Sequence, residues 1–117
     1  MSEKKYIWHK VAESKEELFS SGQSVKEVFV NQKQICLVLK QERIYGCAHK
    51  CPHAGARMAD GWLDVMGNIV CPLHRYRFDL SNGRNTSGEG YYLKTYPVED
   101  REDGVYVGLE KNSWLPF

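Results

Sequence analysis

The sequence has neither a long apolar run nor an excess of charge of one sign. Its 117 residues include 16 Lys and Arg against 15 Asp and Glu, which gives a net charge of +1. Such a balance argues against nucleic acid or an anionic membrane surface as the main partner. No segment approaches the roughly 20 apolar residues of a membrane span, and the N-terminus lacks the apolar stretch of a secretory signal. We therefore expect a soluble, cytoplasmic protein that binds neither nucleic acid nor membrane.

Cysteine is also scarce, with four residues in the chain. A single domain of about 100 to 150 residues buries enough surface to fold without disulfides, so the length predicts one domain that needs no covalent staple. In a protein without an export signal the thiols stay reduced, and Cys/His clusters there more often bind metal. The cysteines are therefore candidates for metal ligands.

Helix signals are few, whereas short runs rich in β-branched and aromatic residues recur along the chain. These runs cover residues 25–31, 34–40, 42–48, 67–71, 76–80, 93–99 and 104–110. They lie too close together for crossover connections, so they should pair antiparallel, with Asn82-Gly83 as the strongest turn signal. Only residues 12–22 suit a helical turn, with Ser14 and Glu17 as a capping box. The sequence predicts a small antiparallel all-β domain.

Two short stretches each combine one Cys with one His. The first is Cys51-Pro-His53 and the second is Cys71-Pro-Leu-His74, with 17 residues between His53 and Cys71. Two such loops, separated by a β excursion, can converge on one site from opposite sides. Together they offer two thiolates and two neutral imidazoles, which are ligands for transition metals.

This pattern resembles the binding motif of the Rieske iron–sulfur family, in which Cys-x-His is followed, after a spacer of this length, by Cys-x-x-His. The resemblance continues through CPHAGA at 51–56 and CPLHRYRFDLSNG at 71–83. It implies one Rieske-type [2Fe-2S] cluster, in which two cysteines hold one iron and two histidines hold the other. Carried over to this chain, the implied iron ligands are Cys51, His53, Cys71 and His74. The resemblance implies no catalytic residue.

The resemblance also implies a fold. Residues 1–117 would form a single all-β Rieske domain, sandwich-like or barrel-like, with a cluster-binding subdomain at about 47–84. That subdomain would be inserted into a basal β domain formed by 1–46 and 85–117. The extra cysteine pair of the cytochrome bc branch is absent, because Ala56 or its neighbours and Leu73 occupy the corresponding positions. The chain is therefore similar to the ferredoxin branch.

Two alternatives concern the ligands themselves. A Cys₂His₂ zinc site uses the same donors, although structural zinc usually pairs Cys-x₂₋₄-Cys with His-x₃₋₅-His. A second Cys-x-His pair, Cys47 with His49, precedes Cys71 by 21 residues and has no Pro after its Cys. We interpret Cys47 as a small buried residue beneath the loop and His49 as a neighbour of the site.

Two further residues are candidates for tuning the cluster. Gly55 would let main-chain N–H groups approach a sulfide, and Tyr76 carries a hydroxyl; an ordinary turn glycine and a strand core residue are the alternatives. Phe78, where the high-potential branch has a hydroxyl, cannot donate, so we expect the lower part of the range of about −150 to +300 mV. Family members commonly cover the cluster's third side with a Pro-containing loop, but residues 87–96 contain no Pro.

The implied function is that of a Rieske-type ferredoxin. Such a protein takes single electrons from a flavin reductase and passes them to an oxygenase or another reductase, as a component of an oxidoreductase system rather than a stand-alone catalyst. One alternative is a Rieske-like small subunit of a larger reductase, of the nitrite reductase type. Another is a redox-sensing or zinc-binding interaction module that transfers no electrons.

Overall fold

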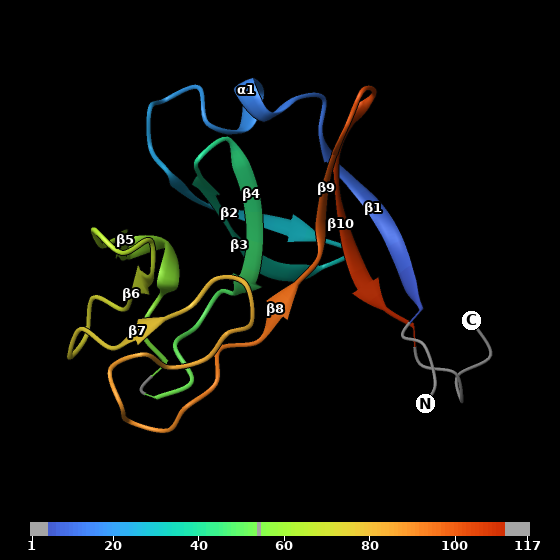
Figure 1. Ribbon diagram of the computed structural model, residues 1–117. Helices are drawn as coiled ribbons and strands as arrows, with labels where there is room; N and C mark the ends of the chain where they lie inside the picture. The colour runs from blue at the N-terminus through green and yellow to red at the C-terminus, as the bar shows by residue number, and fades with distance from the viewer. Residues whose placement is uncertain (1–4, 54, 112–117) are drawn as a thin grey trace.

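The computed structural model describes residues 5–53 and 55–111, in which short strands dominate (Figure 1). In chain order the elements are β1 (Tyr6–Ala12), α1 (Lys15–Leu18), β2 (Val25–Val30), β3 (Lys33–Lys40), β4 (Arg43–Ala48), a 3₁₀ turn (Met58–Asp60), β5 (Trp62–Leu63), β6 (Ile69–Val70), β7 (Arg77–Phe78), β8 (Thr95–Tyr96), β9 (Val98–Arg101) and β10 (Gly104–Glu110). The predicted all-β class is therefore confirmed. No helix within the described ranges is long and apolar enough to cross a bilayer.

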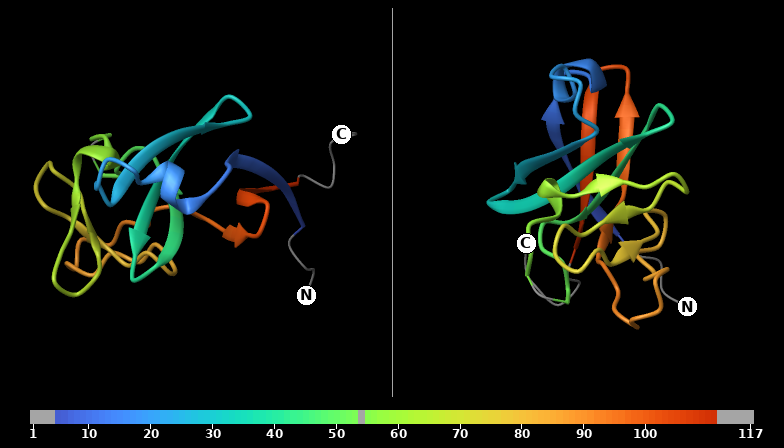
Figure 2. Two further views of the ribbon diagram at one scale, coloured as in Figure 1. Left: turned by 90° about the horizontal axis from the view of Figure 1, so that it is seen from above. Right: turned by 90° about the vertical axis from the view of Figure 1, so that its left-hand side faces the viewer.

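The described strands form three antiparallel sheets. Their orders are β1-β10-β9, β2-β3-β4-β8 and β5-β6-β7. The small β5-β6-β7 sheet and the loops around it form one end of the molecule, and β1 and β10 lie at the other end (Figures 1 and 2). In the sequence one Cys/His motif precedes β5 and the other joins β6 to β7, so the fold gathers both motifs at that end.

The apolar core consists of two clusters on opposite faces of β3. Side chains alternate along a strand, so Ile35 and Leu37 face one cluster and Cys36 and Val38 face the other, all fully buried. The basal core contains Ala12, Leu18, Phe19, Val30, Ile35, Leu37, Ile44, Tyr96, Val105 and Val107. The site-side core contains Val25, Cys36, Val38, Cys47, Cys51, Met58, Ile69, Cys71, Phe78, Leu80 and Leu93. Burial on both faces explains the continuous apolar run of residues 35–39.

The central hairpins and the helical turn agree with the sequence prediction. The predicted strands at residues 25–31, 34–40, 42–48 and 104–110 correspond to β2, β3, β4 and β10, with β3 beginning one residue earlier than predicted. Ser14 caps α1 by accepting the Glu17 N–H at 3.1 Å. In a capping box the Glu17 carboxylate would accept the N–H of Ser14. Here it accepts the N–H of Glu13 instead, at 3.5 Å.

Other strand predictions need correction. Residues 93–99 divide into β8 and β9 on either side of Pro97, which has no N–H to give to a ladder. Residues 67–71 and 76–80 each contribute only two residues to a strand, Ile69–Val70 and Arg77–Phe78. β1 was not predicted, because its half-buried positions follow no clean alternation, and its pairing with β10 joins opposite ends of the sequence.

The predicted Asn82-Gly83 turn is present, but it does not close a long hairpin. The Gly83 N–H donates to the carbonyl of Asp79 at 2.7 Å, and beyond it the pairing with β7 is a single bridge between Phe78 and Asn85. Gly83 has φ = 77°, and a Cβ there would collide with the carbonyl oxygen of Leu93. Only glycine fits this position, after which the chain runs back beside β7.

Candidate metal centre

The two Cys/His loops share one backbone closure. The Cys51 N–H donates to the carbonyl of Ala56 at 2.8 Å, and the Cys71 N–H donates to the carbonyl of Tyr76 at 2.8 Å. In both loops the bond spans five residues and begins at the Cys. Pro follows the Cys in each case, which suits a turn because its φ is fixed and it needs no partner for an N–H. The fold therefore presents two similar turns, one after β4 and one after β6.

The second loop carries unusual backbone angles. His74 and Arg75 have φ values of 63° and 59°, a left-handed conformation that costs a non-glycine residue about 1–2 kcal/mol. Elsewhere in the described residues, positive φ without glycine occurs only in the two-residue hairpin turns at 31–32 and 41–42. Strain of this kind concentrates at functional sites.

Gly55 stands in the first loop at the position that Arg75 has in the second, four residues after the Cys. Its φ is 72°, and a Cβ there would meet no described atom within 4 Å. The left-handed conformation alone therefore accounts for glycine at this position.

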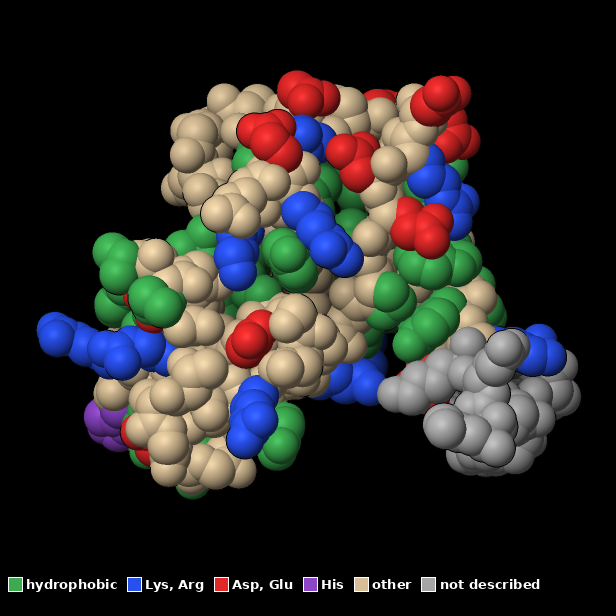
Figure 3. Space-filling view, viewed as in Figure 1, with side chains coloured by type: hydrophobic (Ala, Val, Ile, Leu, Met, Phe, Trp, Pro, Cys, Tyr) green, Lys and Arg blue, Asp and Glu red, His purple; other side chains and the backbone are tan. Residues whose placement is uncertain are grey.

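The loops bring together all four residues that the Rieske resemblance implies as ligands. Cys51 and Cys71 are buried in the site-side core, 2% and 0% exposed. The imidazole rings of His53 and His74 lie side by side, with centroids 4.9 Å apart. A histidine is visible on the surface at this end of the molecule (Figure 3). The thiols thus lie inside and the imidazoles lie toward solvent.

The protonation state of the thiol pair depends on whether a metal is bound. Burial is the main cause that raises the pKa of Cys71 to about 11; the backbone N–H of Leu73 opposes it and the neighbouring Cys51 adds to it. A thiol in this setting stays protonated unless a cation binds, and metal ligation removes the proton.

The imidazole pair supplies a more direct indication. Nδ1 of His53 is buried and makes no hydrogen bond to any described residue. Leaving a polar atom buried without a partner costs about 1–3 kcal/mol, so such atoms call for a ligand. Two thiolates and two imidazole nitrogens are the donor set of a Rieske-type cluster, and the residues present fit that group.

The described side chains do not surround a single ion. No three His, Cys, Asp or Glu side chains in the described ranges meet around one point. A one-ion zinc site requires four donors at about 2.0–2.3 Å from one metal. Two donor pairs, one of thiols and one of imidazoles, suit a two-iron cluster better, since each iron takes two protein ligands.

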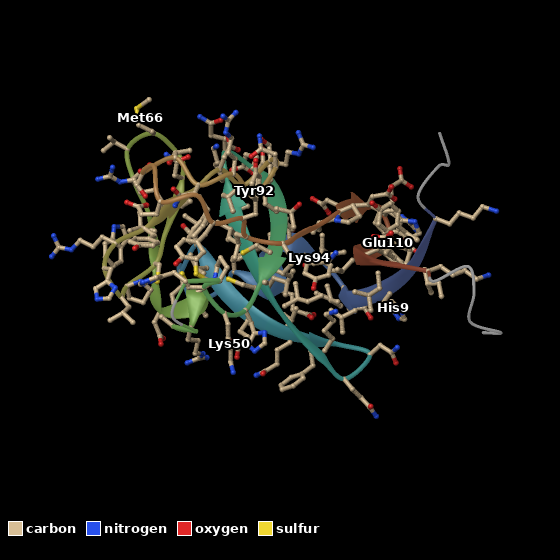
Figure 4. The ribbon with its side chains drawn as sticks, turned by 90° about the horizontal axis from the view of Figure 1, so that it is seen from below. His9, Lys50, Met66, Tyr92, Lys94 and Glu110 are labelled. Carbon is tan, nitrogen blue, oxygen red and sulfur yellow. The ribbon has the colours of Figure 1, made fainter. Side chains whose placement is uncertain are left out.

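The competing pair, Cys47 and His49, lies beneath the first loop. Cys47 pairs across the sheet with Cys36, and both are fully buried in the site-side core. The Cys36 thiol, through a hydrogen bond, and then burial raise the pKa of Cys47 well above its ordinary value. His49 accepts the Met58 N–H with its carbonyl at 2.8 Å, which anchors the end of the loop. The fourth histidine, His9, lies on β1, toward the far end of the molecule from Lys50 (Figure 4).

Aromatic rings surround the histidine pair. Tyr76 stacks on His53 with centroids 4.1 Å apart and an interplanar angle of 32°. Tyr91 packs against His53 at 5.5 Å and against Tyr76 at 5.8 Å. Burial raises the pKa of Tyr76, and Glu89 adds to the effect. Tyr91 was not among the predicted site residues. Its only indication in the sequence is that Tyr91 and Tyr92 form an aromatic pair after the small and polar residues 85–90.

Replacing Asp64 by Ala should destabilise the small sheet that carries the Cys71 loop. The Asp64 carboxylate accepts the N–H groups of Met66 and Asn68, both at 2.9 Å, and lies 3.5 Å from Nε of Arg77. Burial opposes its ionisation, but these donors outweigh burial and hold the pKa of Asp64 below its ordinary value. We expect the free energy of unfolding to fall by about 1.5–3 kcal/mol in urea titrations of iron-loaded protein at pH 7.

Asp60 provides the matched control, because it is exposed and its carboxylate has only a 3.5 Å contact with Arg57. Asp60→Ala should change the free energy of unfolding by less than about 0.5 kcal/mol. A carboxyl whose pKa is lowered by folding stabilises the fold above its unfolded pKa and loses that contribution as pH falls through its folded pKa. The gap between the wild type and Asp64→Ala should therefore close in acid. Equal effects of the two substitutions at pH 7 would contradict the assignment.

Comparison with known proteins gives one consistent result. The family model described as the Rieske [2Fe-2S] domain matches residues 7–97, a stretch that contains both Cys/His loops. The ferredoxin component of the naphthalene 1,2-dioxygenase system of Pseudomonas aeruginosa is 37% identical over 83 residues, which cover 70% of this chain and 79% of the relative. The ferredoxin component of the 2,4-dinitrotoluene dioxygenase system of Burkholderia sp. (strain RASC) is 40% identical over 76 residues, covering 64% and 72%.

Solved structures agree with these sequence matches. One chain in the complex of reduced oxygenase and oxidized ferredoxin in carbazole 1,9a-dioxygenase superposes with a TM-score of 0.72. The two chains are 28% identical, and the match covers 91% of this chain and 96% of that chain.

Proposed function

This chain belongs to the Rieske [2Fe-2S] domain family, and on that premise we propose that it is a soluble, cytoplasmic ferredoxin that carries single electrons from a flavin reductase to an oxygenase. Family membership and the ferredoxin relatives indicate one Rieske-type [2Fe-2S] cluster as its cofactor. The cluster, when bound, supplies the one-electron chemistry, and the protein supplies position, electrostatics and the contact surface.

We propose that Cys51 and Cys71 hold one iron and that His53 and His74 hold the other. The observation that carries this proposal is the convergence of two matching loops, with a buried thiol pair inside and an imidazole pair outside. The buried Nδ1 of His53, which has no partner among the described residues, supports it independently. We also propose that residues 47–84 act as the cluster-binding subdomain and that 1–46 and 85–117 form its base.

The surface around the histidines suits a transient protein partner. His74 is exposed, and so are the basic side chains of Lys50 and Arg75 on the two loops, Arg77 on β7, where it pairs with Asp64, and Arg84 beyond β7. Figure 3 shows basic side chains near the histidine at this end of the molecule. A basic rim accelerates encounter with an acidic redox partner and weakens as salt is added.

The proposed function can be tested by reconstituting the electron path. The iron-loaded protein is mixed with NADH and the flavin reductase of an aromatic-ring dioxygenase system, and its visible absorption is followed by stopped flow. We expect uptake of one electron per chain, then reoxidation when the oxidised oxygenase component is added, with rates that fall as salt rises. The midpoint potential should lie in the lower part of the range of about −150 to +300 mV.

Two results would change the electron acceptor or the kind of complex that we propose. A cluster that dithionite reduces but that no oxygenase reoxidises would leave an electron carrier with a different acceptor. A stable complex with a large reductase subunit, retained through gel filtration from native cells, would favour the nitrite reductase type of role over a diffusing ferredoxin.

A further inference from the structure

The two histidines at the site have unequal surroundings. The side chain of His74 is exposed, whereas His53 is half-buried and its Nδ1 is fully buried. Three rings pack around His53: Tyr76 at 4.1 Å, His74 at 4.9 Å and Tyr91 at 5.5 Å. The ring contacts of His74 in the described residues are His53 and, more distantly, Tyr76 at 6.3 Å. One imidazole is therefore covered and the other is open.

Tyr91 is the ring that covers His53 from outside the two ligand loops. It comes from the segment 85–92, which runs back beside β7 after Gly83 and then loops toward β8 (Figure 1). Its side chain is 38% exposed, so it meets solvent on one side while contacting His53 and Tyr76 on the other. A tyrosine ring in this position excludes water from the imidazole beneath it.

Hydrogen bonds fix the segment that precedes Tyr91, residues 85–90, which we term the strap. The Asn85 side chain donates to the carbonyl of Arg77 at 3.2 Å and accepts the Glu89 N–H at 2.6 Å. The Ser87 hydroxyl accepts the Arg77 N–H at 3.1 Å and also bonds the carboxylate of Glu89. The Thr86 N–H donates to the Arg77 carbonyl at 2.9 Å. The strap is thereby attached to the first residue of β7, beside the Cys71 loop.

We propose that Tyr91, held by the strap, is a positioning residue that covers His53 and keeps water from that side of the site, which leaves His74 as the exposed imidazole. This inference rests on the proposed function. Family members commonly cover this side with a loop that contains proline. In this chain the side-chain hydrogen bonds of the strap would hold the loop in place, and the ring of Tyr91 would cover the site. Water excluded from one face of the cluster cannot stabilise the charge that reduction adds, so the ring also holds the potential down.

The test compares four variants of the iron-loaded protein: Tyr91→Ala, Tyr91→Phe, Asn85→Ala and Tyr92→Ala. Tyr92 is the matched control, because it is adjacent in sequence, 68% exposed and bridged by its backbone to Arg84. Three properties are measured: the solvent-deuteron signal in pulsed EPR of the reduced cluster in D₂O, the midpoint potential, and the half-life of the visible absorption in air.

We expect Tyr91→Ala to increase the deuteron signal, raise the midpoint potential and shorten the half-life several-fold. Asn85→Ala should act in the same direction with a smaller effect, because it loosens the strap but keeps the ring. Tyr91→Phe and Tyr92→Ala should match the wild type. If Tyr91→Ala fails to retain iron while Tyr91→Phe retains it, the need for the ring is supported by that result as well.

The inference fails if Tyr91→Ala and Tyr92→Ala give the same deuteron signal, potential and half-life. It also fails if Tyr91→Phe behaves like Tyr91→Ala, since the hydroxyl rather than the ring would then be responsible. A wild-type protein without the EPR signal of a reduced mixed His/Cys cluster would instead overturn the proposed function. The two failures are thus distinguishable on the same set of samples.

Discussion

Cys51→Ala should abolish the [2Fe-2S] cluster, whereas Cys47→Ala should leave it intact. Both thiols are buried and lie only four residues apart. The two variants therefore test which of the two Cys-x-His pairs in residues 47–53 binds iron. Cys51 begins the loop whose backbone closure matches that of Cys71, and its thiol lies close enough to Cys71 to affect the pKa of that group. Cys47 instead lies on β4, directly opposite Cys36 on β3.

The measurement is iron per chain, visible absorption and low-temperature EPR after dithionite. We expect Cys51→Ala to lose the characteristic signal and most of its iron, and Cys47→Ala to keep about two irons per chain with an unchanged spectrum. His53→Ala and His49→Ala form a second pair with the same expected contrast. Circular dichroism checks that each variant retains its β structure. A cluster that survives in Cys51→Ala and disappears in Cys47→Ala would reverse the ligand assignment.

Phe78→Ala should be the most destabilising substitution in the core around the site. Phe78 is fully buried, pairs with Ile69 across the small sheet and belongs to the core that contains Cys51 and Cys71. Truncating such a ring removes buried apolar area and leaves a cavity, which typically lowers the free energy of unfolding by about 3–5 kcal/mol. Against a total of about 5–15 kcal/mol for an ordinary domain, that loss is severe.

Phe29→Ala is the control for this effect, because the Phe29 side chain on β2 is 69% exposed. It should shift the free energy of unfolding by no more than about 0.5 kcal/mol. Urea titration of both variants, loaded with iron and kept anaerobic, gives the comparison. Similar losses in the two variants would mean that the packing around Phe78 is not what supports the loops.

The central hairpins and the candidate ligands could be predicted from the sequence because their signals are local. Residues 35–39 form a continuous apolar run, which is what a strand buried on both faces requires, and β3 separates the two cores. The ligand candidates follow from residue type and spacing, which the Rieske resemblance made specific. Spacing alone allowed a zinc site, and it is the match to the Rieske [2Fe-2S] family model that favours the cluster.

Other features depend on contacts that the sequence does not display. β1 forms because β10 is available as its partner, and no periodicity within residues 6–12 indicates that pairing. The left-handed backbone at His74 and Arg75 is imposed by the loop closure rather than by residue preference. Tyr91 covers His53 only because the strap attaches to Arg77, through the side chains of Asn85 and Ser87.

The most direct measurement is low-temperature EPR of anaerobically purified protein before and after dithionite, with iron and zinc quantified on the same sample. The account predicts no signal from the oxidised cluster, a signal of the mixed His/Cys type on reduction, and about two irons per chain without zinc. Zinc in place of iron, or the signal of an all-Cys cluster that includes Cys47, would contradict it.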